Sequence, residues 1–267
     1  MRSRFTDDDA EQAAQLLAFA LRPRLLPSRD NAYRELLRRY RHDGPFRTLT
    51  WRIATGLGLR VLGEHEDIGL AIAAVGSSPF ETKMETYARR TQREGGYTER
   101  FLHGIIHLAV AAVSFPRPDD LANNEYVGRV GVDVVDAVVR EACDRLREKA
   151  ASREESADVP SDAPELELAW HSYANRPEAF PTKDKRRATS TTKGMVSRAL
   201  NFLAEQGFLT QVKNAGEDIF QTTRRYQLQV RELAATSAFE ELVALGVVPP
   251  MAVATTPGTT MEGLEDV

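Results

Sequence analysis

The chain has 267 residues, of which 42% are hydrophobic and 28% charged, and its formal net charge is −4. This composition is ordinary for a globular protein, and the length accommodates one large domain or two small ones. The acidic balance argues against a protein whose whole surface binds nucleic acid, but it is compatible with a local basic patch. The single cysteine excludes an internal disulfide and fits a reducing compartment. Because the start lacks an apolar signal core and the longest apolar stretch, 105–113, is too short for a bilayer, we expect a cytoplasmic protein with no membrane partner.

The first 78 residues predict one small domain of three helices and a hairpin. Apolar spacing predicts helices at 10–22, 32–41 and 46–55 and strands at 59–62 and 68–75. The acidic residues at 7–9 are typical of a helix start, and Asp30 or Asn31 can cap the second helix. Gly56 and Gly58 close the third helix. Three helices followed by a β-hairpin wing predict a winged-helix domain over 8–78.

Residues 47–68 and 198–219 look like two copies of one unit that align without a gap. The recurring residues are Arg47, Leu49, Gly56, Val61, Glu66, Asp67 and Ile68, which are matched by Arg198, Leu200, Gly207, Val212, Glu217, Asp218 and Ile219. Trp51 is answered by Phe202. Each copy predicts a helix, a glycine stop and two strands around a polar turn. Convergence on one supersecondary pattern would give the same match, so the repeat is an interpretation.

The second half predicts another domain of this kind, over 98–246, after a connecting helix and linker at 79–97. Its predicted elements are helices at 99–114, 132–146, 189–206 and 231–245 and strands at 208–213 and 219–230. Gly207 is placed to end a helix in a Schellman motif, with Phe208 packing back on Leu203. The composition of 150–188 predicts a flexible insertion, and that of 247–267 a disordered tail. The predicted fold class is therefore mainly α with small β-hairpin wings (α+β), arranged as tandem winged-helix domains.

The clearest charge cluster lies at the start of the helix predicted at 189–206. It comprises Lys183, Lys185, Arg186, Arg187, Lys193 and Arg198, and Arg224 and Arg225 on the predicted last strand extend it. A helix N-terminus with hydroxyls and mobile cations has the components of a phosphate site, which predicts contact with DNA. A solvated basic linker that balances the acidic insertion is the alternative. The gap of about 40 residues before this helix also departs from a DNA-reading helix-turn-helix, whose helices are joined by three or four residues.

Two groups of residues are candidates for binding a protein partner. The leucines of the first two helices, Leu16, Leu17, Leu36 and Leu37, are more apolar than one small domain needs, which favours a homodimer interface. Trp170 and Tyr173, in the insertion, can dock either on this chain or on a partner. The sequence does not decide between the two.

No constellation in the sequence predicts catalysis. His103 and His107 have the spacing of metal ligands on a helix, but no glutamate lies between them and no third ligand is near, so we expect core or helix-surface histidines. Neither GxxxxGK[ST] nor GxGxxG occurs, which argues against an intrinsic ATPase or dinucleotide site. The sequence therefore predicts a protein that is not an enzyme and holds no cofactor or metal.

The order of elements resembles the KITE family, the kleisin-interacting tandem winged-helix elements of SMC complexes, in particular its MukE/MksE-type and Wadjet-type subunits. The resemblance rests on 31–75, on RFLHGII at 100–106, on GVDVV at 131–135 and on LNFLAEQGFL at 200–209. It covers roughly residues 10–245 and concerns architecture and loose pattern rather than an invariant motif. The insertion at 150–188 departs from the simplest layout of the family.

The resemblance implies a non-enzymatic, homodimeric subunit that binds a kleisin, meets the SMC ATPase indirectly and in some complexes touches DNA. In Wadjet-type systems such a complex disables circular foreign DNA, and in MksE-type systems it compacts chromosomes. The expectation is therefore a cytoplasmic, nucleoid-associated protein of antiplasmid defence or chromosome organisation. A stand-alone winged-helix DNA-binding regulator or plasmid replication initiator is the first alternative, and an enzyme of unrecognised type is the second.

Overall fold

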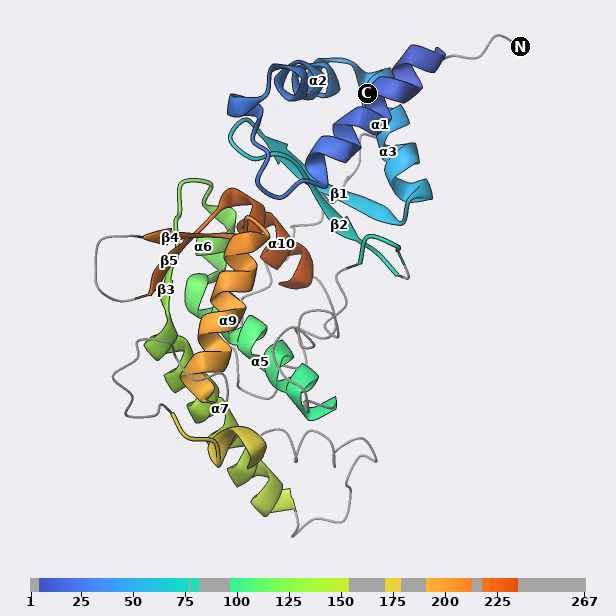
Figure 1. Ribbon diagram of the computed structural model, residues 1–267. Helices are drawn as coiled ribbons and strands as arrows, with labels where there is room; N and C mark the ends of the chain where they lie inside the picture. The colour runs from blue at the N-terminus through green and yellow to red at the C-terminus, as the bar shows by residue number, and fades with distance from the viewer. Residues whose placement is uncertain are drawn as a thin grey trace, which may run out of the picture.

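The computed structural model describes residues 5–76, 78–81, 97–153, 171–178, 191–212 and 218–234. These residues form a mainly helical α+β fold with one two-stranded and one three-stranded antiparallel sheet (Figure 1). The connecting helix expected at 79–97 and the tail at 247–267 fall outside the described residues, apart from a short turn before residue 82 and the first residue of the next helix.

The first unit consists of three helices and a hairpin, close to the predicted ranges. They are α1 (Asp7–Ala20), the 3-10 turn η1 (Pro27–Arg29), α2 (Asn31–His42), α3 (Gly44–Gly56), β1 (Leu59–His65) and β2 (Gly69–Ala74). Asp30 caps α2, as predicted, and Asp43 caps α3. The cap of α1 is Thr6 rather than an aspartate of the acidic cluster, because its side chain accepts from the Asp9 N–H while the Asp9 carboxylate accepts from the Thr6 N–H.

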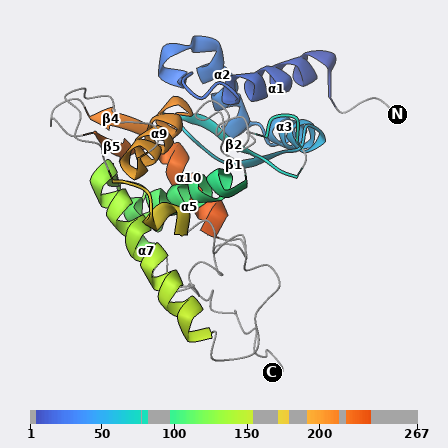
Figure 2. The ribbon, with the colours of Figure 1, turned by 60° about the horizontal axis from the view of Figure 1, so that its bottom comes forward.

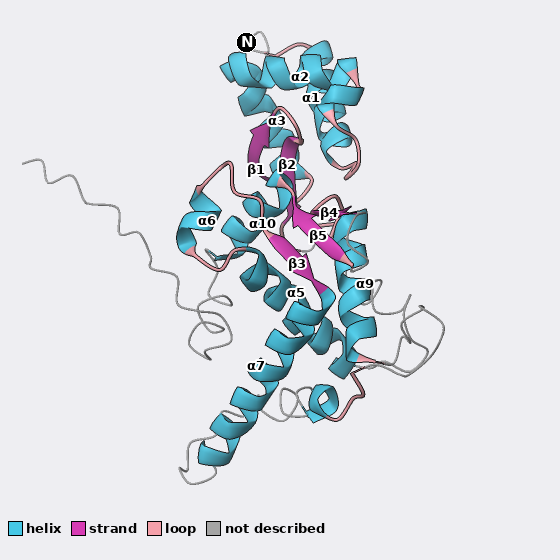
Figure 3. Cartoon of the chain, turned by 90° about the vertical axis from the view of Figure 1, so that its left-hand side faces the viewer, coloured by secondary structure: helices cyan, strands magenta, loops and turns pink. Residues whose placement is uncertain are grey.

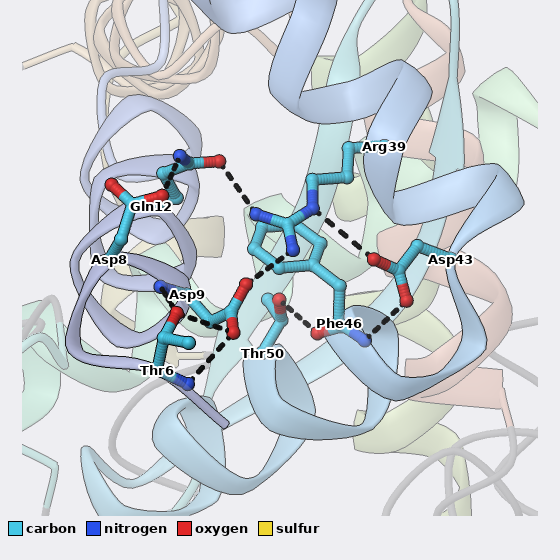
Figure 4. A network of polar contacts seen from close by, with 8 residues as sticks. All are labelled: Thr6, Asp8, Asp9, Gln12, Arg39, Asp43, Phe46 and Thr50. Carbon is cyan, nitrogen blue, oxygen red and sulfur yellow. Dashed lines mark hydrogen bonds and ion pairs between the residues drawn. The ribbon is translucent and has the colours of Figure 1, made fainter. Parts of the chain in front are cut away.

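The helices of the first unit are held together by a polar network around Arg39 as well as by their apolar core (Figure 4). The Arg39 guanidinium pairs with Asp9 of α1, donates to Gln12 at 2.7 Å and reaches Asp43 at 3.3 Å. It also lies 4.2 Å from the centre of the Phe46 ring. One side chain of α2 therefore contacts both neighbouring helices. The hydrogen bond from the Thr6 N–H, and after it the one from Arg39, lower the pKa of Asp9 to about 2.

The second unit has the order helix, helix, strand, helix, helix, strand, strand, helix. Its elements are α5 (Tyr97–Ser114), α6 (Pro118–Ala122), β3 (Arg129–Gly131), α7 (Val132–Arg153), α9 (Thr192–Glu205), β4 (Leu209–Val212), β5 (Ile219–Thr222) and α10 (Arg224–Ala234). The sheet order is β3-β5-β4, so that the strand before α7 pairs with the last strand of the hairpin. A second apolar core lies among these elements, and α7 extends away from it (Figures 2 and 3).

The predicted strand at 219–230 was too long, and the predicted last helix began too late. The chain leaves the sheet at Thr223, whose hydroxyl donates to the carbonyls of Gly207 and Phe208. The Thr223 carbonyl then accepts from the N–H groups of Tyr226 and Gln227, which starts α10. The buried Gln227 side chain donates to three carbonyls of the α6 region, including that of Asp120 at 2.9 Å, and this holds α10 against α6.

The prediction of a flexible insertion over 150–188 is wrong for the part that the structure describes. Helix α7 continues to Arg153, and residues 171–178 pack against the second unit. Tyr173 is fully buried, and its hydroxyl donates to the carboxylate of the equally buried Asp136 at 2.8 Å. Burial, with Asp136 beside it, raises the pKa of Tyr173, so that the hydroxyl keeps the proton it donates.

The two units contact each other through α10 and the hairpin of the first unit (Figures 1 and 3). Leu228 of α10 packs with Ile68 and Ala71 in a small apolar cluster. Arg60 of β1 forms an ion pair with Glu232. On the other side of the junction, the Gly207 backbone lies close to the carbonyl of Pro23, since a Cβ on Gly207 would come within 2.4 Å of that oxygen.

Candidate nucleic-acid interface

The predicted basic cluster does not form an open phosphate site where the structure describes it. Lys183, Lys185, Arg186 and Arg187 lie outside the described residues. Lys193 is placed at the start of α9, but its ammonium lies 2.6 Å from Glu178 and 3.0 Å from Asp133. These two carboxylates raise the pKa of Lys193 and neutralise its charge locally.

The N-terminus of α9 is closed by the segment at 171–178. The N–H groups of Thr192 and Lys193 donate to the carbonyls of Pro177 and Glu178 at 3.1 and 3.3 Å. The Gly194 N–H donates to the side chain of the cap, Thr191. The expectation of free helix donors facing a phosphate is therefore wrong, because the chain itself supplies the acceptors.

The remaining predicted cations do not gather beside Lys193. Arg198 is partly buried in α9, where its charge contributes to the lowered pKa of His103. Arg224 and Arg225 begin α10 instead of lying on a wing strand, and both line a cavity between the two units.

Most of the predicted partner residues belong to the protein's own core. The four leucines Leu16, Leu17, Leu36 and Leu37 are between 0% and 8% exposed and pack inside the first unit. Their predicted role as an interface is wrong for this fold, because a single small unit buries all of them. Tyr173 docks on its own chain, and Trp170 lies outside the described residues.

The structure instead presents a basic, aromatic face on α3. Its exposed side chains recur at helical spacing: Arg47, Thr48, Trp51, Arg52 and Thr55. Trp51 is 53% exposed, and its indole N–H donates to the Tyr40 hydroxyl, which fixes the ring against α2. The opposite face of the helix, with Phe46, Thr50 and Ala54, is buried, so this orientation follows from core packing.

Charge on this face of α3 is not compensated. The side chains of Arg47 and Arg52 are exposed and form no ion pair or hydrogen bond with any described residue, and α3 contains no acidic residue. Guanidinium groups and hydroxyls on an exposed helix are the groups that bind phosphate oxygens in DNA. Next to Trp51, a hollow of about 480 Å³ extends to Arg60 and Val75. The sequence analysis did not identify this face, although a helix without acidic residues that carries Arg47, Trp51 and Arg52 is a pattern that could have predicted a binding surface.

Of the two histidines of α5, His103 is a core residue and His107 is half-buried at the edge of the second core. His103 is fully buried, and burial lowers its pKa to about 3 and that of His107 to about 4. The His107 ring packs edge-on against Phe202 of α9, with ring centres 6.0 Å apart. Within the described ranges, no group of three or more His, Cys, Asp or Glu side chains could hold a metal ion, and no helix is long and apolar enough to cross a membrane.

Comparison with protein-family models, with curated proteins and with solved structures found no match for this chain.

Proposed function

We propose that the chain is a tandem winged-helix protein that binds duplex DNA through α3 and acts as an accessory subunit of an SMC-type complex. Two features of the fold support the winged-helix assignment. The first unit has three helices followed by the β1–β2 hairpin, and only Asp43 lies between α2 and α3. Apart from the short α6 and the last helix α10, the second unit has the order helix, strand, helix, helix, strand, strand, and its first strand, β3, pairs with β5 of the β4–β5 hairpin.

The observation that carries DNA contact is the uncompensated exposed face of α3. In a helix-turn-helix, the second helix of the pair reads the major groove. Here that helix presents Arg47 and Arg52 beside an exposed indole, with no carboxylate of its own to oppose them. The corresponding helix of the second unit, α9, is closed at its N-terminus by Pro177 and Glu178. Contact is therefore assigned to the first unit.

The accessory role rests on the resemblance to the KITE family together with this division between the units. One unit has an exposed basic helix, α3, whereas the N-terminus of the corresponding helix of the other unit, α9, is covered by residues 177 and 178. This division fits a subunit that contacts DNA with one unit and binds protein partners within a complex. In this proposal a kleisin is the direct partner, the SMC ATPase is an indirect one, and a homodimer forms through a surface other than the buried leucines. The protein itself performs no catalytic step.

A stand-alone DNA-binding regulator or plasmid replication initiator is the second candidate. The short link between α2 and α3, a single residue at Asp43, favours it, because it is closer to the three- or four-residue turn of helices that read operators than the long gap of the second unit is. This candidate requires sequence-specific binding by the isolated protein, whereas the accessory subunit requires only backbone contact.

The assay that tests DNA contact is fluorescence anisotropy of the full chain with duplex DNA over a range of salt concentrations. We expect Arg47→Gln/Arg52→Gln to weaken binding and to reduce the log–log salt slope by about 2, one unit for each lost phosphate contact. The matched control is Arg145→Gln/Arg147→Gln, which removes the same charge from exposed positions of α7. Equal losses in both variants would assign the effect to net charge rather than to α3.

The role in an assembly is tested by affinity capture of the tagged protein from its source cells. Co-elution of a long coiled-coil ATPase and a bridging protein would support the accessory subunit. Recovery of the protein with one specific DNA sequence and no such partner would favour the regulator or initiator.

A further inference from the structure

A cavity of about 900 Å³ lies at the junction of the two units. Its wall combines the loop after α1, the hairpin turn of the first unit, the loop before β3 and the start of α10, all in the part of the chain that the structure describes. This volume falls within the range of sites that enclose a small molecule. Both units contribute to the wall, so an occupant would contact both.

Four arginines line this cavity without a carboxylate partner among the described residues. Arg24 and Arg29 come from the first unit, and their side chains form no hydrogen bond or ion pair with a described residue. Arg224 donates only to the side-chain amides of Asn124 and Gln227. Arg225 is partly buried with neither kind of contact, and burial lowers its pKa. Arg225 has lost water without gaining an anion, which is unfavourable, and the exposed guanidinium groups of Arg24 and Arg29 in the same cavity can pair with an anionic ligand.

The remaining lining favours a nucleotide over a simple anion. Asp67, Glu125 and Glu205 also line the cavity, and among the described residues none of them forms an ion pair or hydrogen bond with these arginines. The charge of Glu125 only partly offsets the lowering of the Arg224 pKa by burial. Carboxylates of this kind accept hydrogen bonds from ribose hydroxyls. Tyr126, Leu26 and Ile68 add aromatic and apolar surface, on which a base can pack. Cations, carboxylates and an apolar wall in one cavity match the phosphates, the sugar and the base of a nucleotide.

We propose that the junction cavity binds a nucleoside polyphosphate, with its phosphates held by Arg24, Arg29, Arg224 and Arg225. Since these arginines come from both units, the bound nucleotide stabilises one relative arrangement of the two. This inference does not depend on DNA binding by α3, whose arginines line no part of the cavity.

The test is isothermal titration of the full chain with ATP and GTP, each compared with its nucleoside and with inorganic pyrophosphate. We expect saturable binding of at least one nucleoside triphosphate, accompanied by a higher melting temperature. The nucleoside, which lacks the phosphates, is expected to bind at least about tenfold more weakly.

Two double variants localise the binding. Arg24→Gln/Arg29→Gln changes only exposed positions between α1 and α2 and is expected to weaken binding about tenfold or more while the fold is kept. Arg47→Gln/Arg52→Gln removes the same charge from α3 and is expected to leave nucleotide affinity unchanged.

Three results would overturn the proposal: no heat of binding at millimolar nucleotide, equal weakening by both variants, or pyrophosphate binding as tight as that of the triphosphates. If Arg24→Gln/Arg29→Gln instead weakened only duplex DNA binding, the cavity would belong to the DNA interface. The α3 variant tests DNA contact separately, so failure of one proposal leaves the other intact.

Discussion

Trp51 and Phe202 occupy equivalent positions of the two repeated segments but meet opposite surroundings. Trp51 is 53% exposed on α3, and its indole N–H donates to the Tyr40 hydroxyl. Phe202 packs edge-on against His107 and onto the second apolar core. The same position on two similar helices is therefore exposed to solvent in the first unit and packed against the core in the second. Of the two side chains, only Trp51 is available to a ligand.

Alanine substitution at these two positions should separate binding from stability. Phe202→Ala removes part of the second core, which should cost roughly 1–3 kcal/mol of unfolding free energy. Trp51→Ala should leave stability nearly unchanged and weaken duplex DNA binding by about 1 kcal/mol or more, as expected for an exposed aromatic anchor. Urea unfolding and DNA anisotropy on both variants provide the comparison. Loss of stability in Trp51→Ala with unchanged DNA binding would contradict the assignment of α3.

The contact of Tyr173 with Asp136 should control how tightly the 171–178 segment covers α9. Tyr173→Phe leaves Arg140, 3.0 Å away, as the remaining partner of the buried Asp136 among the described residues. The lost hydrogen bond should cost about 1–3 kcal/mol of unfolding free energy. Amide exchange at Thr192 and Lys193 should become faster, because their acceptors are Pro177 and Glu178. The matched control is Tyr126→Phe, whose hydroxyl makes no hydrogen bond with a described residue. Equal effects of the two substitutions would show that the segment is held by ring packing alone.

Local sequence signals located the helices well because their causes are local. Asp30 caps α2 as predicted. Gly207 ends α9 in the predicted Schellman motif: the Phe208 N–H donates to the Leu203 carbonyl, and the Gly207 N–H donates to the Ala204 carbonyl. β3 was missed because three residues are too few to show a period. The strand predicted at 219–230 was too long because β5 ends where the Thr223 hydroxyl donates to the carbonyls of Gly207 and Phe208, which lie about 15 residues earlier in the chain.

The site could not be predicted because burial depends on contacts between distant segments. Tyr173 and Asp136 are separated by 37 residues, so nothing near Tyr173 in the sequence reveals its partner. The leucines predicted to form a dimer surface are buried in the core of the first unit. Likewise, the repeats at 47–68 and 198–219 share residues, but only the fold determines that α3 is open and the start of α9 is covered.

Stability should fall as the pH is lowered from about 7.5 to 5 because of His103 and His107. Burial lowers their pKa values from an ordinary 6.5 to about 3 and about 4, so the unfolded chain takes up protons in this range and the folded chain does not. Each histidine should lower the free energy of unfolding by about 2 kcal/mol at pH 5, and this loss should begin near pH 6.5. Urea unfolding at pH 7.5, 6 and 5 measures this slope. His107→Leu should remove part of it, and a flat profile in the original chain would contradict the buried, neutral state of both rings.

Gly56 and Gly207 are equivalent in the repeats, yet alanine should be tolerated at only one of them. Gly207 has φ +72°, and a Cβ there would lie 2.4 Å from the Pro23 carbonyl oxygen of the other unit. The left-handed backbone alone costs about 1–2 kcal/mol for alanine, and the contact with Pro23 adds to this. Gly56 lies within α3 with nothing within 4 Å of its Cβ position, so Gly56→Ala should be neutral or stabilising by up to about 1 kcal/mol. Thermal unfolding should show Gly207→Ala melting lower by several degrees and Gly56→Ala unchanged or higher, since 1 kcal/mol corresponds to about 2–4 °C in a chain of this size. Equal melting temperatures would mean that the close approach of Gly207 to Pro23 is absent in solution.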